Sequence, residues 1–265
     1  MLAKRSLPVG AVLAALATVA LASAHPLRGA RKCPVFPKDN PWNERVDRAP
    51  VAPNSAELIR SIGLGAHLHP DFGSGTWEGA PIGIPYATVS RRQRKLPVRF
   101  DYADESDRGP YPIPPNVPIE GGRRSSGDRH VIVVDRDRCR AYELYAAYPI
   151  SGGARWRAGS GAIWNLRSNR LRPRNWTSAD AAGLPILPGL ARSEEVRRGE
   201  IDHALRFTAP KTTRIVPELI RSKSTVSAIS VRNRAAEMTA SSPAIFIGAL
   251  RGPPDRKLVS ADLAH

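Results

Sequence analysis

The stretch that decides the fold is H-V-I-V-V-D-R-D-R-C-R-A-Y-E-L-Y, residues 130–145. Two runs rich in branched and aromatic residues, 130–135 and 140–145, flank a short polar segment. Such runs are typical of strands, and polar residues between two strands indicate a turn. The sequence therefore predicts a β-hairpin, with Cys139 at its bend.

Other segments extend this pattern along the chain. Residues 84–89, 98–102 and 203–208 are short and rich in branched or aromatic residues, as strands are. Clusters of Pro and Gly at 108–122 and 149–153 indicate longer loops. Many short strands separated by loops predict a mainly β domain, a sandwich or jelly roll, with a few short helices.

Three short helical segments are expected between the strands. One begins at Asn54, where a Glu three residues later completes the spacing of a capping box. A second begins near Thr177 or Ser178 and ends at Gly183, and Ser193 is expected to cap a short turn at 194–198. The apolar segment 184–189 contains two prolines, which exclude a central strand, so we expect a buried connector there.

The N-terminus has the three-part pattern of a secretory signal peptide, which we place at residues 1–24. Lys4 and Arg5 precede an apolar run at 7–21, and Ala-Ser-Ala at 22–24 is a small-residue cleavage signal. A bilayer span needs about 20 apolar residues, so an uncleaved anchor is the less favoured alternative. No later segment is apolar enough to cross a membrane. We expect a secreted protein, extracellular or associated with the cell envelope.

The formal net charge of the 265-residue chain is +16. For an exported protein the nearest polyanions are wall polymers, phospholipid headgroups and extracellular nucleic acid. Such a charge favours adhesion to an anionic surface without identifying the ligand. The chain contains no nucleic-acid-binding motif, so nucleic acid is not an expected partner. It also lacks the nucleophile elbow G-x-S-x-G, a Walker loop and a dinucleotide fingerprint.

The chain contains two cysteines, Cys33 and Cys139. An even number in an oxidising compartment predicts a disulfide, and two free buried thiols are the alternative. A closed loop of this length stabilises the folded state by about 4–5 kcal/mol in the chain-entropy model.

Two imidazoles and a carboxylate alternate in H-L-H-P-D, residues 67–71. On an extended segment, side chains two residues apart share a face, so His67, His69 and Asp71 can converge. This set suits a divalent metal such as zinc or iron. It equally suits acid–base or binding chemistry without metal, or a plain polar loop. No H-E-x-x-H pattern completes a metal motif.

Two more histidines extend this candidate catalytic set. His130 and His203 each open a predicted strand, at sheet edges where sites often form. An imidazole titrates near neutral pH and suits proton transfer. The alternative for each is a histidine satisfied by a backbone carbonyl. In an enzyme, one histidine would act as base or metal ligand and Asp71 would orient it.

The densest acidic cluster in this basic chain is a candidate calcium site, because carboxylate oxygens are the ligands that calcium prefers. Its members are Asp101, Asp104, Glu105 and Asp107. The alternative is salt bridging to nearby arginines, namely Arg91, Arg92, Arg94 and Arg108. A pair of these acids could also serve glycoside cleavage.

Tryptophans beside Asn, Gly and Arg are a common means of stacking on a sugar ring, although a Trp is more often part of a core. The five tryptophans of the chain, all in such contexts, are Trp42, Trp77, Trp156, Trp164 and Trp176.

The chain from Cys33 to about Pro210 resembles a group of exported proteins of soil actinobacteria. The resemblance rests on H-L-H-P-D-F-G-S-G at 67–75, F-D-Y-A-D-E-S-D at 100–107, G-D-R-H-V at 127–131, W-T-S-A-D-A-A-G-L-P-I-L-P-G-L at 176–190 and I-D-H-A-L-R-F-T at 201–208. The group has no established activity, so the resemblance assigns no role to any residue. Its polar, loop-like motifs suggest a shared polar site, with residues 66–75 as one wall.

These observations predict a secreted domain that acts on or binds envelope or extracellular polysaccharide, as a hydrolase, a lyase or a binding module. The alternatives are a non-catalytic wall-binding or structural protein and an inactive, truncated relative. No cofactor is indicated except a divalent metal. We expect one β-rich domain at 25–210.

Composition changes after Pro210. Of sixteen aromatic residues, only Phe246 lies beyond it, and apolar positions follow no sustained period. This predicts a basic, poorly ordered tail at 211–265. The related group continues differently here, which suggests a shifted reading frame near Thr213. A basic tail that binds the anionic wall is the alternative.

Overall fold

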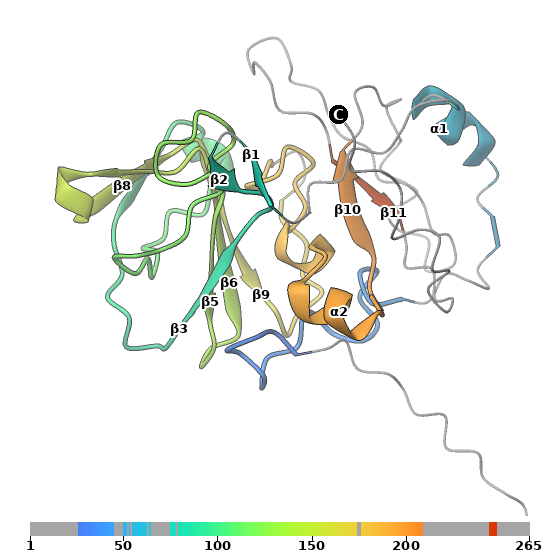
Figure 1. Ribbon diagram of the computed structural model, residues 1–265, viewed down its shortest axis with the longest axis horizontal. Coiled ribbons are helices and arrows are strands. Elements are labelled where there is room, and N and C mark those ends of the chain that lie inside the picture. The colour runs from blue at the N-terminus through green and yellow to red at the C-terminus, as the bar shows by residue number, and fades with distance from the viewer. Residues whose placement is uncertain are drawn as a thin grey trace, which may run out of the picture.

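The protein is mainly β, as the sequence predicts, and is seen in a computed structural model (Figure 1). The structure describes residues 26–44, 50, 51, 53, 55–62, 64, 75–77, 79–173, 176–208 and 244–247. The predicted signal peptide lies outside the described residues.

The central element is a four-stranded sheet in the order β3-β5-β6-β9. Its strands are β3 (Tyr86–Val89), β5 (Val131–Asp135), β6 (Arg140–Tyr145) and β9 (Ser160–Asn165). β5 and β6 form the predicted hairpin, which is therefore confirmed. β3 runs parallel to β5, whereas β9 runs antiparallel to β6.

A second, three-stranded sheet has the order β4-β8-β7. It contains β4 (Val98–Phe100), β8 (Arg155–Ala158) and β7 (Tyr148–Ile150). The prediction of a loop at 149–153 is wrong, because the end of β7 and a 3₁₀ turn, η2 (Ser151–Gly153), occupy it. Gly152 and Gly153 take positive φ there, which lets the chain turn tightly into β8.

The remaining elements are short. Two small pairs of strands are β1 (Thr76–Trp77) with β2 (Ala80–Pro81), and β10 (Leu205–Thr208) with β11 (Ala244–Ile247). The α-helices are α1 (Ser55–Ile62), in its predicted position, and α2 (Ser193–Arg198), where only a capped turn is predicted. Two further 3₁₀ turns are η1 (Ala103–Glu105) and η3 (Leu187–Gly189).

Both faces of the four-stranded sheet are covered, which is why every residue of β5 is buried. On one face, Val131 and Val133 pack in a core with Phe100 and Trp156 of the three-stranded sheet. Two sheets therefore enclose one core, as in the predicted sandwich. Each fully buried Val or Phe side chain contributes roughly 1.5–3 kcal/mol to folding.

The other face is covered by irregular chain rather than by a sheet. Ile132 and Val134 pack there with buried residues of the segments 26–44 and 184–190. Ile186 and Leu187 are wholly buried, so the predicted apolar connector is confirmed.

The disulfide Cys33–Cys139 is present, with 5.2 Å between the two Cα atoms. It fastens the N-terminal segment to the bend of the β5–β6 hairpin, as predicted. Cys139 takes a positive φ of 49° at this bend.

The predicted helix at 177–183 is wrong. Ser178 and Asp180 instead hold a turn, because the Ser178 Oγ accepts the Asp180 N–H at 2.9 Å and the Asp180 carboxylate accepts the Ala182 N–H at 2.8 Å. Ser and Asp side chains compete with helical hydrogen bonding in this way.

Within the predicted tail, the structure describes only β11, which pairs antiparallel with β10. Residues 209–243 and 248–265 lie outside the described residues, so a poorly ordered tail stays a prediction for them. Over the described part of the chain, no helix is long and apolar enough for a membrane span.

Candidate functional site

The predicted site at residues 67–71 lies outside the part of the chain that the structure describes. His67, His69 and Asp71 lie outside the described residues, so their role as metal ligands or acid–base groups stays a prediction. The described part of the chain holds no group of three or more His, Cys, Asp or Glu side chains that could bind a metal ion.

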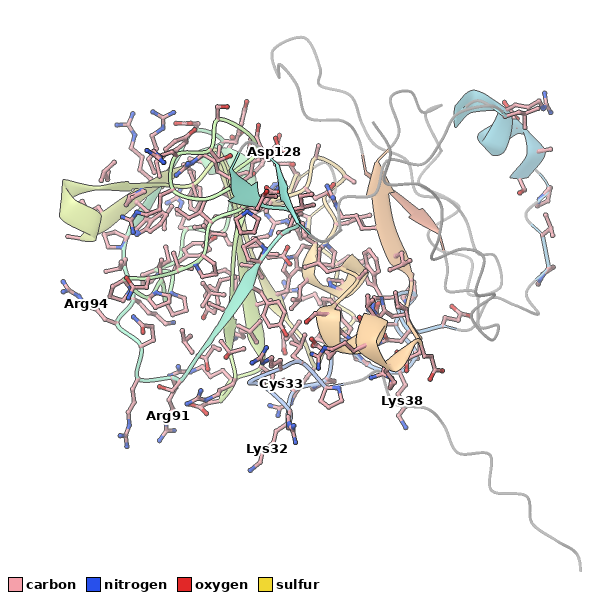
Figure 2. All side chains as sticks on the ribbon, viewed as in Figure 1. Lys32, Cys33, Lys38, Arg91, Arg94 and Asp128 are labelled. Carbon is pink, nitrogen blue, oxygen red and sulfur yellow. A yellow bond between two sulfur atoms is a disulfide. The ribbon has the colours of Figure 1, made fainter. Side chains whose placement is uncertain are left out.

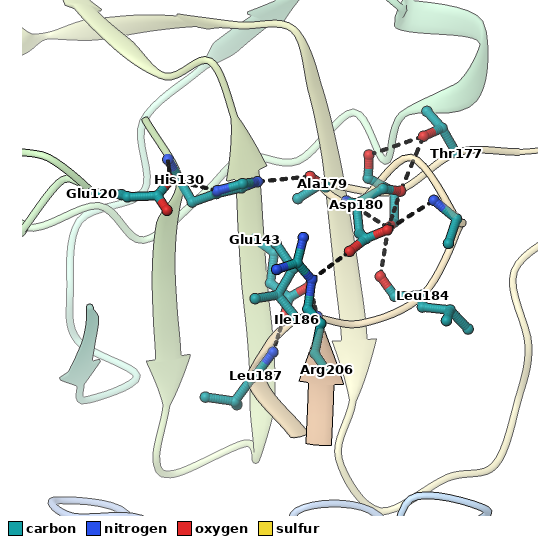
Figure 3. A network of polar contacts seen from close by, with 12 residues as sticks. Glu120, His130, Glu143, Thr177, Ala179, Asp180, Leu184, Ile186, Leu187 and Arg206 are labelled. Atoms are coloured by element: carbon teal, nitrogen blue, oxygen red, sulfur yellow. Dashed lines mark hydrogen bonds and ion pairs between the residues drawn. The ribbon is translucent and has the colours of Figure 1, made fainter. Parts of the chain in front are cut away.

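His130 lies at the start of β5, with both ring nitrogens engaged (Figure 3). Its Nδ1 is 2.6 Å from the carboxylate of Glu120, and its Nε2 is 3.0 Å from the carbonyl oxygen of Ala179. Because both partners are acceptors, both nitrogens donate, which requires the doubly protonated imidazolium. The ring is 3 % exposed, so it is placed to join loops rather than to reach a substrate.

Protonation of this pair follows from its geometry. Burial disfavours charge on His130, but the hydrogen bond and charge of Glu120 outweigh it and raise the pKa of His130 above its ordinary value. Burial likewise opposes charge on Glu120, but the hydrogen bond and charge of His130 outweigh it and lower its pKa. The two residues form an ion pair.

His203 has a similar environment. Its Nδ1 lies 2.7 Å from the carbonyl oxygen of Ala204, and its Nε2 lies 3.1 Å from the carboxylate of Glu195. Arg192 donates to the same carboxylate. Burial opposes the charge on Glu195, but His203 and Arg192 outweigh it and lower the pKa of that carboxyl. This buried cluster joins α2 to the segment that precedes β10.

Three of the four acids proposed as calcium ligands have separate partners. Asp101 forms an exposed ion pair with Arg157, at 3.4 Å, and Asp104 is exposed. The other two bind the irregular segment beyond β9. The Glu105 carboxylate accepts the Thr177 N–H at 2.9 Å, and Asp107 pairs with Arg172. Salt bridging is therefore the role that the structure gives Asp101 and Asp107, with Arg157 and Arg172 in place of the four arginines named from the sequence.

Glu143 is a buried acid that the sequence reasoning missed. It lies in the middle of β6 with no exposed surface, and its carboxylate accepts hydrogen bonds from the backbone N–H groups of Ile186 and Leu187 and from Trp164 Nε1. Burial raises the pKa of Glu143, although these hydrogen bonds oppose the rise. A lone acid within the apolar run A-Y-E-L was the available signal, because a buried carboxylate requires partners.

Asp180 and Arg206 complete the network in Figure 3. The Arg206 Nε donates to the Asp180 carboxylate at 2.7 Å, and both residues are buried. This pair joins the turn after Trp176 to β10. The network thus connects loops and strands through two ion pairs and through a buried carboxylate that accepts backbone hydrogen bonds.

The outer face of the three-stranded sheet is different, because its charged groups face solvent. Paired residues on adjacent strands share a face, and Arg99, Arg157 and Tyr148 form one row across the sheet. Arg155 and Ile150 form the neighbouring row. All five side chains are exposed, and β8 lies at the left of the molecule in Figure 1. We name these five residues the sheet face.

Tyr148 is held in place from below by a buried arginine. The guanidinium of Arg129 stacks on the Tyr148 ring, 4.2 Å from its centroid, and is 2 % exposed as a residue. It also donates to the carbonyl oxygens of Arg123 and Ser125, each at 2.9 Å. Arg157 approaches the same ring at 5.9 Å. The sheet face therefore presents a partly exposed aromatic ring that a buried arginine holds in place and an exposed arginine approaches.

The described tryptophans do not form a row of exposed rings on which a sugar chain could stack. Trp42, Trp156 and Trp164 are buried in the two cores. Trp176 is half-buried against Arg172, and the side chain of Trp77 lies outside the described residues. Tyr148 is thus the aromatic ring that accompanies the exposed arginines.

Comparison with protein-family models, with curated proteins and with solved structures found no match to this chain.

Proposed function

We propose that this protein is an exported, non-catalytic module that binds acidic polysaccharide of the cell envelope through the sheet face. The observation that supports the proposal is the row Arg99–Arg157–Tyr148 with Arg155 beside it, all exposed on one face. Arginine forks bind carboxylate and phosphate groups in a bidentate manner, and an aromatic ring stacks on a sugar. The two adjacent rows of the sheet face thus contain arginines that can bind anionic groups and a tyrosine ring that can stack on a sugar.

The spacing of these groups suits an extended polymer. Arg155 and Arg157 are two residues apart on β8, a separation of about 6.6–6.8 Å along a strand. Repeating anionic groups of a polymer laid along the sheet can thus meet successive arginines. Asp101 forms an ion pair with Arg157, which indicates that this guanidinium can bind a carboxylate.

A non-catalytic role is favoured over hydrolase or lyase chemistry by the state of the described histidines. His130 and His203 are both buried, and each of their ring nitrogens has an acceptor close to it. A general base must reach the proton that it abstracts, and neither ring is placed to do so. The enzymatic alternative rests on His67, His69 and Asp71.

Binding to purified cell walls and to a soluble uronic-acid polysaccharide tests the proposal. The variant Arg99→Gln/Arg155→Gln/Arg157→Gln removes the cations of the sheet face. Exposed charge contacts contribute up to about 1 kcal/mol each, so we expect affinity to fall roughly tenfold to a hundredfold. Neutral dextran should bind poorly to both proteins.

The matched control removes three exposed arginines from elsewhere: Arg94→Gln/Arg170→Gln/Arg197→Gln. We name it the scattered control. It has the same net charge as the sheet-face variant and should bind the acidic polysaccharide as the wild type does. Equal loss in both variants would mean that net charge alone governs binding, and the proposal would be wrong.

Metal analysis of the purified protein addresses the enzymatic alternative. Bound zinc or iron that disappears in His67→Ala/His69→Ala would favour an enzyme and contradict the non-catalytic proposal. Incubation of the polysaccharide with the protein, followed by a reducing-end assay, should release no new ends if the proposal is correct.

A further inference from the structure

We propose that the protein has a second, separate binding surface, for anionic phospholipid, at the end of the four-stranded sheet that carries the disulfide. This proposal does not depend on polysaccharide binding by the sheet face.

The topology of the sheet brings several basic segments to that end. β3 and β5 are parallel, and β9 is antiparallel to β6, which is itself antiparallel to β5. The C-terminal ends of β3, β5 and β9 therefore meet the N-terminal end of β6. The disulfide adds the N-terminal segment, because Cys33 is bonded to Cys139 in the β5–β6 bend.

Exposed basic residues gather at and after these strand ends and in the N-terminal segment. We name as the basic end the side chains Arg31, Lys32, Arg91, Arg92, Arg136, Arg138, Arg140 and Arg167. Asp137 is the exposed acid among these segments, and its carboxylate accepts the Arg91 N–H at 2.8 Å. In Figure 2, Lys32 and Arg91 lie along the lower edge of the molecule, near Cys33.

The basic end is held as one unit by covalent and backbone bonds. The Arg136 N–H donates to the Val89 carbonyl oxygen at 3.0 Å, and the Leu166 N–H donates to that of Cys139 at 2.9 Å. These contacts join the end of β3 to the hairpin and the hairpin to the end of β9. Together with the disulfide, they hold eight cations at one end of the sheet, where Asp137 and the buried Asp135, which pairs with Arg138 at 3.0 Å, offset part of the mutual repulsion.

A lipid surface fits this arrangement better than a polymer chain does. The cations lie on turns at one end of the sheet, so they can contact a flat lipid surface at the same time, and no groove is needed. None of the exposed large apolar side chains of the described chain belongs to these segments, so a stacking platform for sugars or bases is missing there. Binding that relies on basic residues at an anionic leaflet is worth about 1 kcal/mol per residue and is weakened by salt.

Sedimentation with phosphatidylcholine vesicles, with and without phosphatidylglycerol, tests the proposal on the protein recovered after export. The variant Arg91→Gln/Arg92→Gln/Arg136→Gln changes exposed side chains only. Wild type should bind the anionic vesicles and ignore the neutral ones. The variant should bind on the order of a hundredfold more weakly, since three residues at about 1 kcal/mol each are removed. Added salt should release the wild type.

Two controls separate this proposal from the preceding one. The scattered control should retain vesicle binding, and thermal unfolding should show each variant to be folded. The sheet-face variant should lose polysaccharide but keep vesicles. Absence of wild-type binding to anionic vesicles at low salt would overturn the proposal. An equal loss of vesicle binding in the scattered control would also overturn it. The same holds if Arg91→Gln/Arg92→Gln/Arg136→Gln loses binding to cell walls but keeps binding to vesicles.

Discussion

Replacement of Glu120 by Gln should destabilise the protein in a way that depends on pH. In the wild type, the imidazolium of His130 donates to Glu120 from a site where the two side chains are 4 % and 24 % exposed. A neutral Gln removes the charge that keeps His130 protonated. His130 then becomes neutral, and its Nε2 still donates to Ala179. Its Nδ1 can accept from the amide, but the His130 backbone N–H, which donates to the same Glu120 oxygen at 3.1 Å, then loses its acceptor.

The magnitude follows from the kind of hydrogen bond that is lost. A hydrogen bond to a charged group contributes about 1.5–3 kcal/mol, whereas a neutral one contributes about 1 kcal/mol. Near pH 6 the variant should therefore lose about 2 kcal/mol of unfolding free energy. For a domain of this size, that corresponds to a fall in Tm of roughly 4–8 °C.

The sign of the pH dependence is set by the two pKa shifts. The folded pKa of His130 is raised, so its contribution is full below its ordinary value of 6.5 and disappears as pH rises through the folded pKa. The folded pKa of Glu120 is lowered, so its contribution is present above its ordinary value of 4.5 and disappears as pH falls through the folded pKa. The difference between wild type and variant should be largest between these limits and should shrink towards pH 9.

Urea unfolding followed by tryptophan fluorescence measures this difference at each pH. Asp107→Asn is the matched control, because its partner Arg172 stays protonated at all these pH values. Its destabilisation should be equal near pH 6 and pH 9. A Glu120→Gln effect that does not change with pH would refute the imidazolium assignment, as would nitrogen NMR shifts showing an unprotonated Nδ1 near pH 6.

Three further outcomes are expected. Gly161→Ala should destabilise by about 1–3 kcal/mol in urea unfolding, because a Cβ there would lie 2.6 Å from atoms of two buried aromatic side chains, whereas Gly127→Ala, with its nearest contact at 3.5 Å, should change stability by less than about 0.5 kcal/mol. Reduction of Cys33–Cys139 should lower the unfolding free energy by about 4–5 kcal/mol, and non-reducing mass spectrometry that finds two free thiols would contradict the bond itself. Limited trypsin digestion should cut first within 211–243, and resistance of this segment would contradict the tail predicted from its composition.

The β5–β6 hairpin could be predicted from sequence, whereas β9 could not. The hairpin has two branched or aromatic runs around a polar bend, which is a local signal. β9 begins with Ser160 and Gly161, which have low strand propensity. Glycine is required at 161 because Phe100 and Tyr111 occupy the space beside it, and that contact between distant segments is invisible in a linear reading.

The candidate site shows the same limit. The sequence identified His130 as a titratable group at a strand end, which is where the structure places it. It could not show that irregular chain covers that face of the sheet, which leaves the ring buried with two acceptors. Nor could it place Arg99, Arg157 and Tyr148 in one row, because that depends on the register of β4 and β7 against β8.

Several polar segments that are distant in the sequence contact one another, and these contacts hold loops together. In the segment 176–183, the Ala179 carbonyl oxygen accepts a hydrogen bond from His130 Nε2. The Thr177 N–H of the same segment donates to the Glu105 carboxylate. It also binds Arg206 through Asp180. Three motifs distant in sequence are thereby tied to a turn that has no helix or strand of its own. Irregular chain buried against a sheet must satisfy its polar groups locally, so such motifs are needed for folding whether or not a reaction takes place nearby. The polar residues of this network are therefore accounted for by packing of loops, and a search for chemistry is best directed at His67, His69 and Asp71.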